Sequence, residues 1–293
     1  SKIMMPIIIV LLFVLAIRGL TLPGGIDGLK FLFLPRFDEL TASAIVLALG
    51  HSFFTLSLGM GTMITYGSYI NQKQNLLNSA LWVIALDTAI ALLAGTAIFT
   101  SVFAAGADPD GGPGLIFYIL PSIFPQLAYG AIWGTLFFTL LFMAALTSAI
   151  SILEVVTAYF IDQKGWSRNR ATIQFGAIIT VVGVFCSFSM GGGINIAEYF
   201  GSSFQHYLGE TFFDVMDNLS SKYMLPFGGM MTAIFILVRW GVPSFLSEFG
   251  GENLDSEKNR LIVTIFCFIA AGVAGFILLN ELIETITGNA IIG

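Results

Sequence analysis

Long apolar stretches alternate with short, turn-rich connections along the whole chain. At about 1.5 Å per residue, a stretch of about 20 residues crosses the hydrocarbon core of a bilayer. Two further apolar pieces, Leu115–Leu127 and Ile194–Leu208, are too short to span, and we expect re-entrant or surface helices there. The pattern predicts an all-α integral membrane protein with about seven transmembrane helices, near residues 2–20, 43–70, 77–105, 130–161, 170–190, 211–239 and 260–280.

The composition excludes an ordinary soluble domain. Hydrophobic residues make up 56% of the 293 positions and charged residues only 10%, whereas soluble domains carry about 25% charged residues. The net charge of -6 and the absence of a long basic stretch disfavour a nucleic-acid partner. The expected partner is a lipid bilayer, and we expect a multi-pass protein of the cell (inner) membrane. Cys186 and Cys267 both lie in apolar stretches and are expected to be core thiols.

The second apolar stretch contains three glycines, Gly50, Gly59 and Gly61, around a run of hydroxyl side chains. Glycine costs about 1 kcal/mol relative to alanine within a helix, so this stretch favours a broken helix. In a membrane, such a break offers backbone carbonyls to a cation and a helix amino terminus to an anion. The same residues also fit close packing of an unbroken helix against a neighbour, and composition alone leaves both interpretations open.

Asp87 lies deep in the third apolar stretch, far from any other charge in the sequence. A charge at that depth costs at least about 2.5 kcal/mol, which makes a functional role the default hypothesis. Sodium, a proton or a buried base would each satisfy it. The alternative is a protonated Asp87 that is hydrogen-bonded to a neighbouring helix.

Hydroxyl side chains share one face of the fourth apolar stretch, where Thr147 and Ser151 are one helical turn apart. Hard oxygen ligands of this type suit an alkali cation. The alternative is that the Ser and Thr hydroxyls bond back to their own helix. Asp214 and Asp217, at the start of the sixth stretch, have helix capping or solvation as their ordinary role.

Catalysis is disfavoured, and the chain is not expected to be an enzyme. A nucleophilic Ser57 or Ser148 would need a base at similar depth, and the only histidines are His51 and His206. His51 is six residues before Ser57 on a helix that is itself interrupted, and we expect it to be a satisfied core residue. No organic cofactor is indicated.

Two ordered motifs resemble the neurotransmitter:sodium symporter (NSS) family, in particular its bacterial amino-acid transporters. Phe54–Gly61, followed by Ile64–Tyr69, is similar to the family's unwound sixth helix, and Leu146–Ala149 to its eighth. The resemblance runs over essentially all of residues 1–293. It implies a single transmembrane transporter domain with a partial LeuT-type inverted-repeat fold and an unwound helix at 50–61. The chain would hold helices five to eleven, and the missing amino-terminal four helices of the same protein are an expected partner.

The resemblance also implies two sodium sites. Thr55 and Asp87 would be ligands of the first sodium, and a negative charge at Asp87, where many members have Asn, suggests chloride independence. The second sodium would be bound by the carbonyl of Ala144 and the hydroxyls of Thr147 and Ser148.

A substrate site and two gates are implied in the same way. The mostly apolar lining fits a hydrophobic or aromatic amino acid, and the flexible Met60 suits bulky side chains. Asp217 would pair with an arginine on the absent first helix, and the inner latch also lacks its arginine here, so we expect these acids to be unpaired in this chain. The substrate lining would comprise Phe54, Thr55, Ser57, Met60, Ser148 and Ile152, the outer gate Asp217, and the inner gate Ser68, Tyr69, Glu154 and Asp162.

The function that these residues predict is sodium-coupled symport of an amino acid by alternating access. The alternative is a non-transporting membrane scaffold or a degenerate half-transporter.

Overall fold

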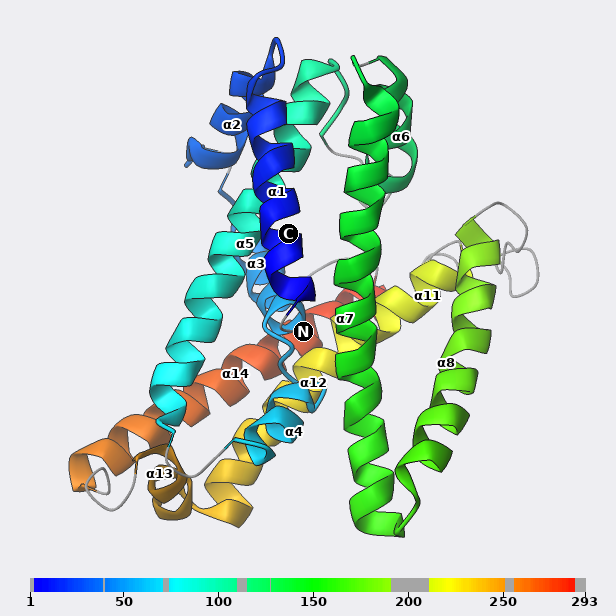
Figure 1. Ribbon diagram of the computed structural model, residues 1–293. Helices are drawn as coiled ribbons and strands as arrows, with labels where there is room; N and C mark the ends of the chain where they lie inside the picture. The colour runs from blue at the N-terminus through cyan, green and yellow to red at the C-terminus, as the bar shows by residue number, and fades with distance from the viewer. Residues whose placement is uncertain are drawn as a thin grey trace. The chain divides into compact units, whose positions relative to one another are not determined.

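The computed structural model describes residues 3–38, 40–70, 74–109, 115–126, 128–190, 211–250 and 256–287. Its regular elements in these ranges are helices (Figure 1). They form two compact units, one of Ser1–Glu39 with Val83–Ile150 and one of Leu40–Trp82 with Ser151–Gly293. The second predicted surface segment, Ile194–Leu208, lies outside the described residues.

The first unit is built around α1 and the carboxyl-terminal part of α5. It contains α1 (Met4–Leu20), α2 (Gly25–Phe33), most of α5 (Leu76–Ala104), η1 (Leu115–Ile119), α6 (Leu120–Ile123), η2 (Phe124–Gln126) and the first part of α7 (Gly130–Lys164). Gly19 of α1 lies directly against α5, since a Cβ there would be 1.9 Å from Thr100 Oγ1. Leu15, Val102, Leu120 and Phe137 belong to one buried cluster. The short helices expected within Leu115–Leu127 are thus confirmed, and they pack onto this core.

The second unit contains the broken span and the carboxyl-terminal helices. They are α3 (Ala42–Thr55), α4 (Thr62–Ser68), the rest of α7, α8 (Arg168–Met190), α11 (Phe212–Asn218), η3 (Leu219–Met224), α12 (Leu225–Phe235), η4 (Ile236–Trp240), α13 (Val242–Gly250) and α14 (Glu257–Thr287). Helices α12 and α14 lie side by side, and α3 packs against both. Helix α11 packs on α8, where the Phe213 amide donates to Ser189 Oγ at 3.0 Å.

Five of the predicted spans are continuous helical stretches long and apolar enough to cross a membrane. The first predicted span is the 17-residue helix α1, which is bent by 115° from α2. The second is broken, so neither of these two has the form of a single long helix in the described residues. The amphipathic helices α2 and α13 were not expected, because the turn-rich residues 21–28 and the charged stretch 247–260 both suggested connections.

Candidate functional site

Helix α3 ends at Thr55 in a hydrogen-bonded turn that reverses the backbone. The Leu58 amide donates to the Phe53 carbonyl at 2.8 Å, and the Ser57 amide to the Phe54 carbonyl at 3.1 Å. This pair of bonds is the Schellman motif, whose left-handed position is usually glycine. Here that position is Ser57, at φ 54°. A left-handed conformation costs a non-glycine residue about 1 kcal/mol, so the serine side chain is retained at an energetic cost.

Two glycines complete the break before the chain becomes helical again. Gly59 has φ 78° and Gly61 has φ 82°, and α4 begins at Thr62 with Gly61 as its N-cap. The predicted broken helix is therefore confirmed, although the break covers residues 56–61 rather than 50–61. Gly50 lies within α3, where the nearest atom to an added Cβ would be Ile277 Cγ2 at 3.9 Å. A single glycine did not interrupt the helix there.

The unwound residues 56–61 rest directly on α12, a feature that the sequence analysis missed. A Cβ on Gly59 would lie 2.2 Å from the Leu225 carbonyl oxygen, and a Cβ on Gly228 would lie 2.1 Å from the Gly59 carbonyl oxygen. The two backbones are thus in direct contact. The adjacent pair Gly228–Gly229 within an apolar span was the available sequence signal.

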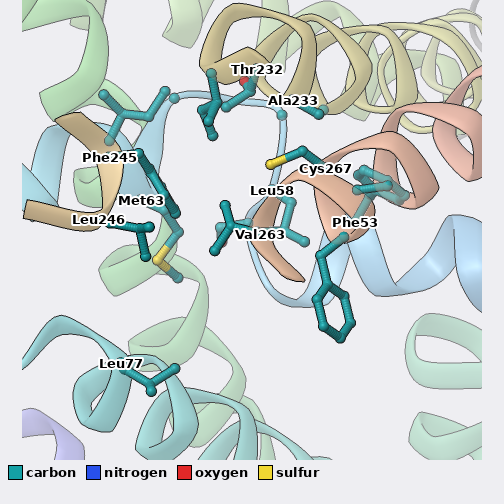
Figure 2. A pocket seen from close by; sticks show the side chains of 18 of the residues that line it. Phe53, Leu58, Met63, Leu77, Thr232, Ala233, Phe245, Leu246, Val263 and Cys267 are labelled. Atoms are coloured by element: carbon teal, nitrogen blue, oxygen red, sulfur yellow. The ribbon is translucent and has the colours of Figure 1, made fainter. Parts of the chain in front are cut away.

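An apolar cavity of about 700 Å³ lies beside the unwound residues. Figure 2 shows side chains from α3, α4, α12, α13 and α14 around it, among them Phe53, Met63, Phe245 and Cys267. Of the predicted substrate-lining residues, only Ser57 lines this cavity. The predicted substrate lining and this cavity therefore share Ser57 but are otherwise lined by different residues.

The predicted substrate-lining residues are distributed over both units. Phe54, Thr55, Ser57 and Met60 lie at the end of α3 and in the unwound residues, while Ser148 and Ile152 lie one turn apart on α7. Phe54 and Ile152 are 54% and 48% exposed in this chain. Because Ser148 belongs to the other unit, its meeting with Phe54 stays a prediction.

Two of the residues predicted to bind the second sodium are in contact within the first unit. Thr147 Oγ1 donates to the Ala144 carbonyl at 2.8 Å, so two of the three predicted ligand oxygens are adjacent. Ser148 is the next residue and is exposed. The back-bonding alternative for Thr147 is therefore observed, yet its hydroxyl oxygen keeps lone pairs that can accept a cation. Hard hydroxyl and carbonyl oxygens fit sodium by the same oxygen-ligand chemistry that binds other hard cations.

The two predicted ligands of the first sodium lie in different units. Asp87 is half-buried in α5, and Thr55 is the last residue of α3. Both take part in interactions with other residues. Their pairing around one ion stays a prediction.

Two of the predicted inner-gate residues, Tyr69 and Glu154, take part in a side-chain network in the second unit. Tyr69 donates to Glu154 Oε1 at 2.8 Å, and Arg168 donates to Glu154 Oε2 at 2.5 Å. One turn earlier on each helix, Tyr66 donates to Ser151 Oγ at 3.0 Å. The expectation that Glu154 would be unpaired is wrong, because the turn after α7, with Gly165 at φ 64°, returns Arg168 to the side of Glu154.

The other two inner-gate residues are not part of this network. Ser68 donates to the Thr65 carbonyl of its own helix at 2.7 Å. Asp162 is exposed on α7, eight positions after Glu154. The structure thus unites Tyr69 and Glu154 of the predicted set and adds Arg168.

Asp217, the predicted outer gate residue, is exposed on α11. Five residues later Lys222 forms an ion pair with Glu281 of α14 at 3.7 Å. Asp214 caps α11 in a capping box with Thr211, accepting its amide at 2.9 Å, so the capping role expected at this helix start is confirmed for Asp214.

The expectation that His51 is a core residue is wrong. It is exposed in this chain and its ring meets Phe54 edge-on at 6.5 Å. Cys267 is buried and Cys186 half-buried, both as free thiols. Within the described ranges, no group of three His, Cys, Asp or Glu residues is arranged to hold a metal ion.

Comparison with known families identifies the class to which this fold and broken span belong. Residues 1–289 match the model of the Sodium:neurotransmitter symporter family. The chain belongs to this family of multi-pass membrane transporters.

Individual relatives agree with this assignment. An uncharacterised sodium-dependent transporter of Bacillus subtilis, YhdH, is 37% identical over 86% of this chain and 54% of its own length. A second uncharacterised sodium-dependent transporter, from Haemophilus influenzae, is 34% identical over 90% of this chain and 55% of its own length. These relatives are transporters by name, in agreement with the expectation that the chain is not an enzyme.

A solved structure with the same fold is the crystal structure of MhsT in complex with L-phenylalanine. It is 43% identical, with a TM-score of 0.79 over 95% of this chain and 61% of that one. The LeuT-type fold is thereby confirmed for the region the chain covers. The chain spans about half the length of the curated relatives that it matches.

Proposed function

We propose that the protein containing this chain couples the uptake of a hydrophobic or aromatic amino acid to the entry of sodium. The observation that carries the proposal is the break at residues 56–61, within a chain that is 43% identical to MhsT, which was solved with L-phenylalanine. A broken helix at this position leaves backbone carbonyls free for an ion and substrate. Because the chain spans about half of its relatives, the activity is that of the whole protein.

Each predicted residue has a distinct role in this proposal. Thr55 and Asp87 bind one sodium, and Ala144, Thr147 and Ser148 bind a second. The substrate side chain lies against Phe54, Ser57, Met60, Ser148 and Ile152. Outward-facing and inward-facing states differ in their affinity for sodium, and this difference couples the ion gradient to transport.

The gates control access from the two sides. Asp217 contributes to the outer gate. Tyr69, Glu154 and Arg168 tie α4 to the inner end of α7 and to the start of α8, and the proposal is that this network stabilises the state closed to the cytoplasm. Ser68 and Asp162 remain assigned to the same gate by resemblance.

The test is uptake of labelled Phe, Leu, Tyr and Trp into proteoliposomes that contain the whole protein. Uptake should require an inward sodium gradient and should be unchanged when gluconate replaces chloride. Asp87→Ala should lose sodium-driven uptake, and Thr147→Val/Ser148→Ala should raise the half-saturating sodium concentration. Wild-type protein that shows no sodium dependence would contradict the proposal and favour the scaffold alternative.

A further inference from the structure

One face of α12 contacts the unwound residues 56–61 through glycine. Leu225, Gly228, Gly229 and Thr232 recur at the three- and four-residue spacing that places side chains on one side of a helix. Thr232 Oγ1 donates to the Gly228 carbonyl at 2.8 Å. This helix face therefore presents little more than backbone to the chain that lies on it.

The contact leaves no room for a methyl group at Gly228. A Cβ there would lie 2.1 Å from the carbonyl oxygen and 2.9 Å from the carbonyl carbon of Gly59. Both are backbone atoms, so no side-chain rotation relieves the overlap. To relieve the overlap, residues 56–61 or α12 itself would have to move by about 1 Å. This is roughly the difference between the overlapping distance and an ordinary non-bonded contact distance.

Gly229 has a different neighbour. A Cβ at Gly229 would lie 2.3 Å from Cε1 and 3.0 Å from Cδ1 of Phe53, a side chain of α3 that also lines the cavity in Figure 2. An aromatic ring can turn aside at smaller cost than a backbone. Gly228 thus contacts the unwound residues 56–61, and Gly229 contacts the end of α3 that precedes them.

We propose that Gly228 and Gly229 of α12 are positioning residues, which set the location of the unwound residues 56–61 and hence of the substrate and sodium ligands on them. The inference rests on the proposed function, since it assigns Thr55, Ser57 and Met60 to that site. Misplacing a binding group by about 1 Å can cost about 100-fold in activity. Neither Gly228 nor Gly229 is assigned as a substrate or ion ligand in this proposal.

The first experiment measures uptake kinetics of Gly228→Ala and Gly229→Ala in the whole protein. Gly228→Ala should raise both the substrate KM and the half-saturating sodium concentration at least about tenfold, with a smaller change in the maximal rate per folded molecule. Gly229→Ala should raise both about threefold, and adding Phe53→Leu should restore them. A purely structural role would instead lower the amount of folded protein and leave KM unchanged.

Gly272→Ala on α14 and Gly183→Ala on α8 are the matched controls, because an added Cβ at either position meets nothing within 4 Å. Both should leave the two constants within a factor of two. Values within a factor of two for Gly228→Ala as well would overturn the proposal. If Gly228→Ala fails to fold, the milder Gly229→Ala and its Phe53→Leu rescue decide the outcome.

A second readout is independent of transport. Ser57→Cys, in a Cys186→Ser/Cys267→Ser background, reports the exposure of the unwound residues through its rate of maleimide labelling. Adding Gly228→Ala should change that rate at least about threefold, whereas adding Gly272→Ala should not. If wild-type protein lacks sodium-dependent uptake, the proposed function fails, and the labelling rate alone decides the positioning role; an unchanged rate refutes it.

Discussion

The broken span α3–α4 and the continuous helix α7 carry the predicted oxygen ligands in opposite ways. In the broken span, Ser57, Gly59 and Gly61 adopt left-handed conformations, and residues 56–61 leave the helix. Helix α7 runs unbroken for 35 residues, and its Thr147 hydroxyl bonds to the Ala144 carbonyl within the helix. Both stretches are rich in hydroxyl groups, so hydroxyl content does not decide whether a helix breaks.

The difference lies in glycine and in what supports it. In the broken span the left-handed Gly59 rests on the α12 backbone at Leu225 and Gly229, whereas the glycines of α7 are confined to its first turns, at Gly130 and Gly134. A break in a membrane span exposes polar backbone that must be satisfied or packed. A supporting surface on a second helix is therefore as necessary as the left-handed residues themselves.

Among the substitutions that test this difference, Gly59→Ala should have the largest effect on uptake. It places a side chain at φ 78° and 2.2 Å from the Leu225 carbonyl oxygen, so both conformational strain and overlap oppose it. Sodium-driven uptake per folded molecule should fall about 100-fold. Retention of more than a tenth of wild-type uptake would show that the break does not depend on this contact.

Thr147→Val with Ser148→Ala tests the unbroken helix. The pair removes two hydroxyl oxygens with little change of volume, and valine leaves the Ala144 carbonyl in its helical bond. The half-saturating sodium concentration should rise about tenfold, since a hydrogen-bond-strength contact to an ion contributes about 1.5 kcal/mol. Thr180→Val on α8, whose hydroxyl also bonds within its own helix, is the matched control and should leave sodium dependence unchanged.

Ser57→Gly should stabilise the fold while weakening substrate binding. Removing a side chain from φ 54° relieves about 1 kcal/mol, which corresponds to a rise in Tm of about 2 °C. The substrate KM should rise about threefold, because the serine hydroxyl is lost from the proposed site. An unchanged Tm would mean that the left-handed serine is not strained.

Tyr69→Phe should have the smallest effect. It removes the hydrogen bond to Glu154 but leaves the Arg168 ion pair, and exposed polar contacts contribute about 1 kcal/mol or less. Cysteine labelling from the cytoplasmic side should increase about twofold at Ser68→Cys. Tyr159→Phe on α7, a tyrosine whose ring meets Phe160 edge-on at 5.3 Å, is the control and should not alter the rate.

The spans were predictable because apolar runs of this length are typical of membrane-crossing helices and rare in soluble domains. The break was predictable at Gly59 and Gly61, but the predicted range began too early, because Gly50 is accommodated inside α3. Helix α13 was missed although Val242, Phe245 and Leu246 show helical spacing. It was missed because it is short and lies next to residues that are typical of turns.

The chemistry of the site was less accessible from sequence. Arg168 is 14 positions from Glu154, and only the turn between α7 and α8 makes them neighbours. The contact of Gly228 with Gly59 likewise joins segments that are far apart in sequence. A family motif names residue types at a site but does not specify the surface that supports them.

Helix α12 is bounded at both ends by wider π-helical turns, η3 (Leu219–Met224) and η4 (Ile236–Trp240). A π turn takes up one more residue than an α turn, and in an α-helix each residue accounts for about 100° of rotation. The turn at η3 therefore fixes the angle between the face that carries Asp217 and the face that carries Gly228. Because the wide turn takes up the extra residue, deleting one residue from η3 would restore an ordinary α turn with little change in that angle. Inserting one residue into α12 before Gly228 would instead rotate the Asp217 face by about 100° relative to Gly228.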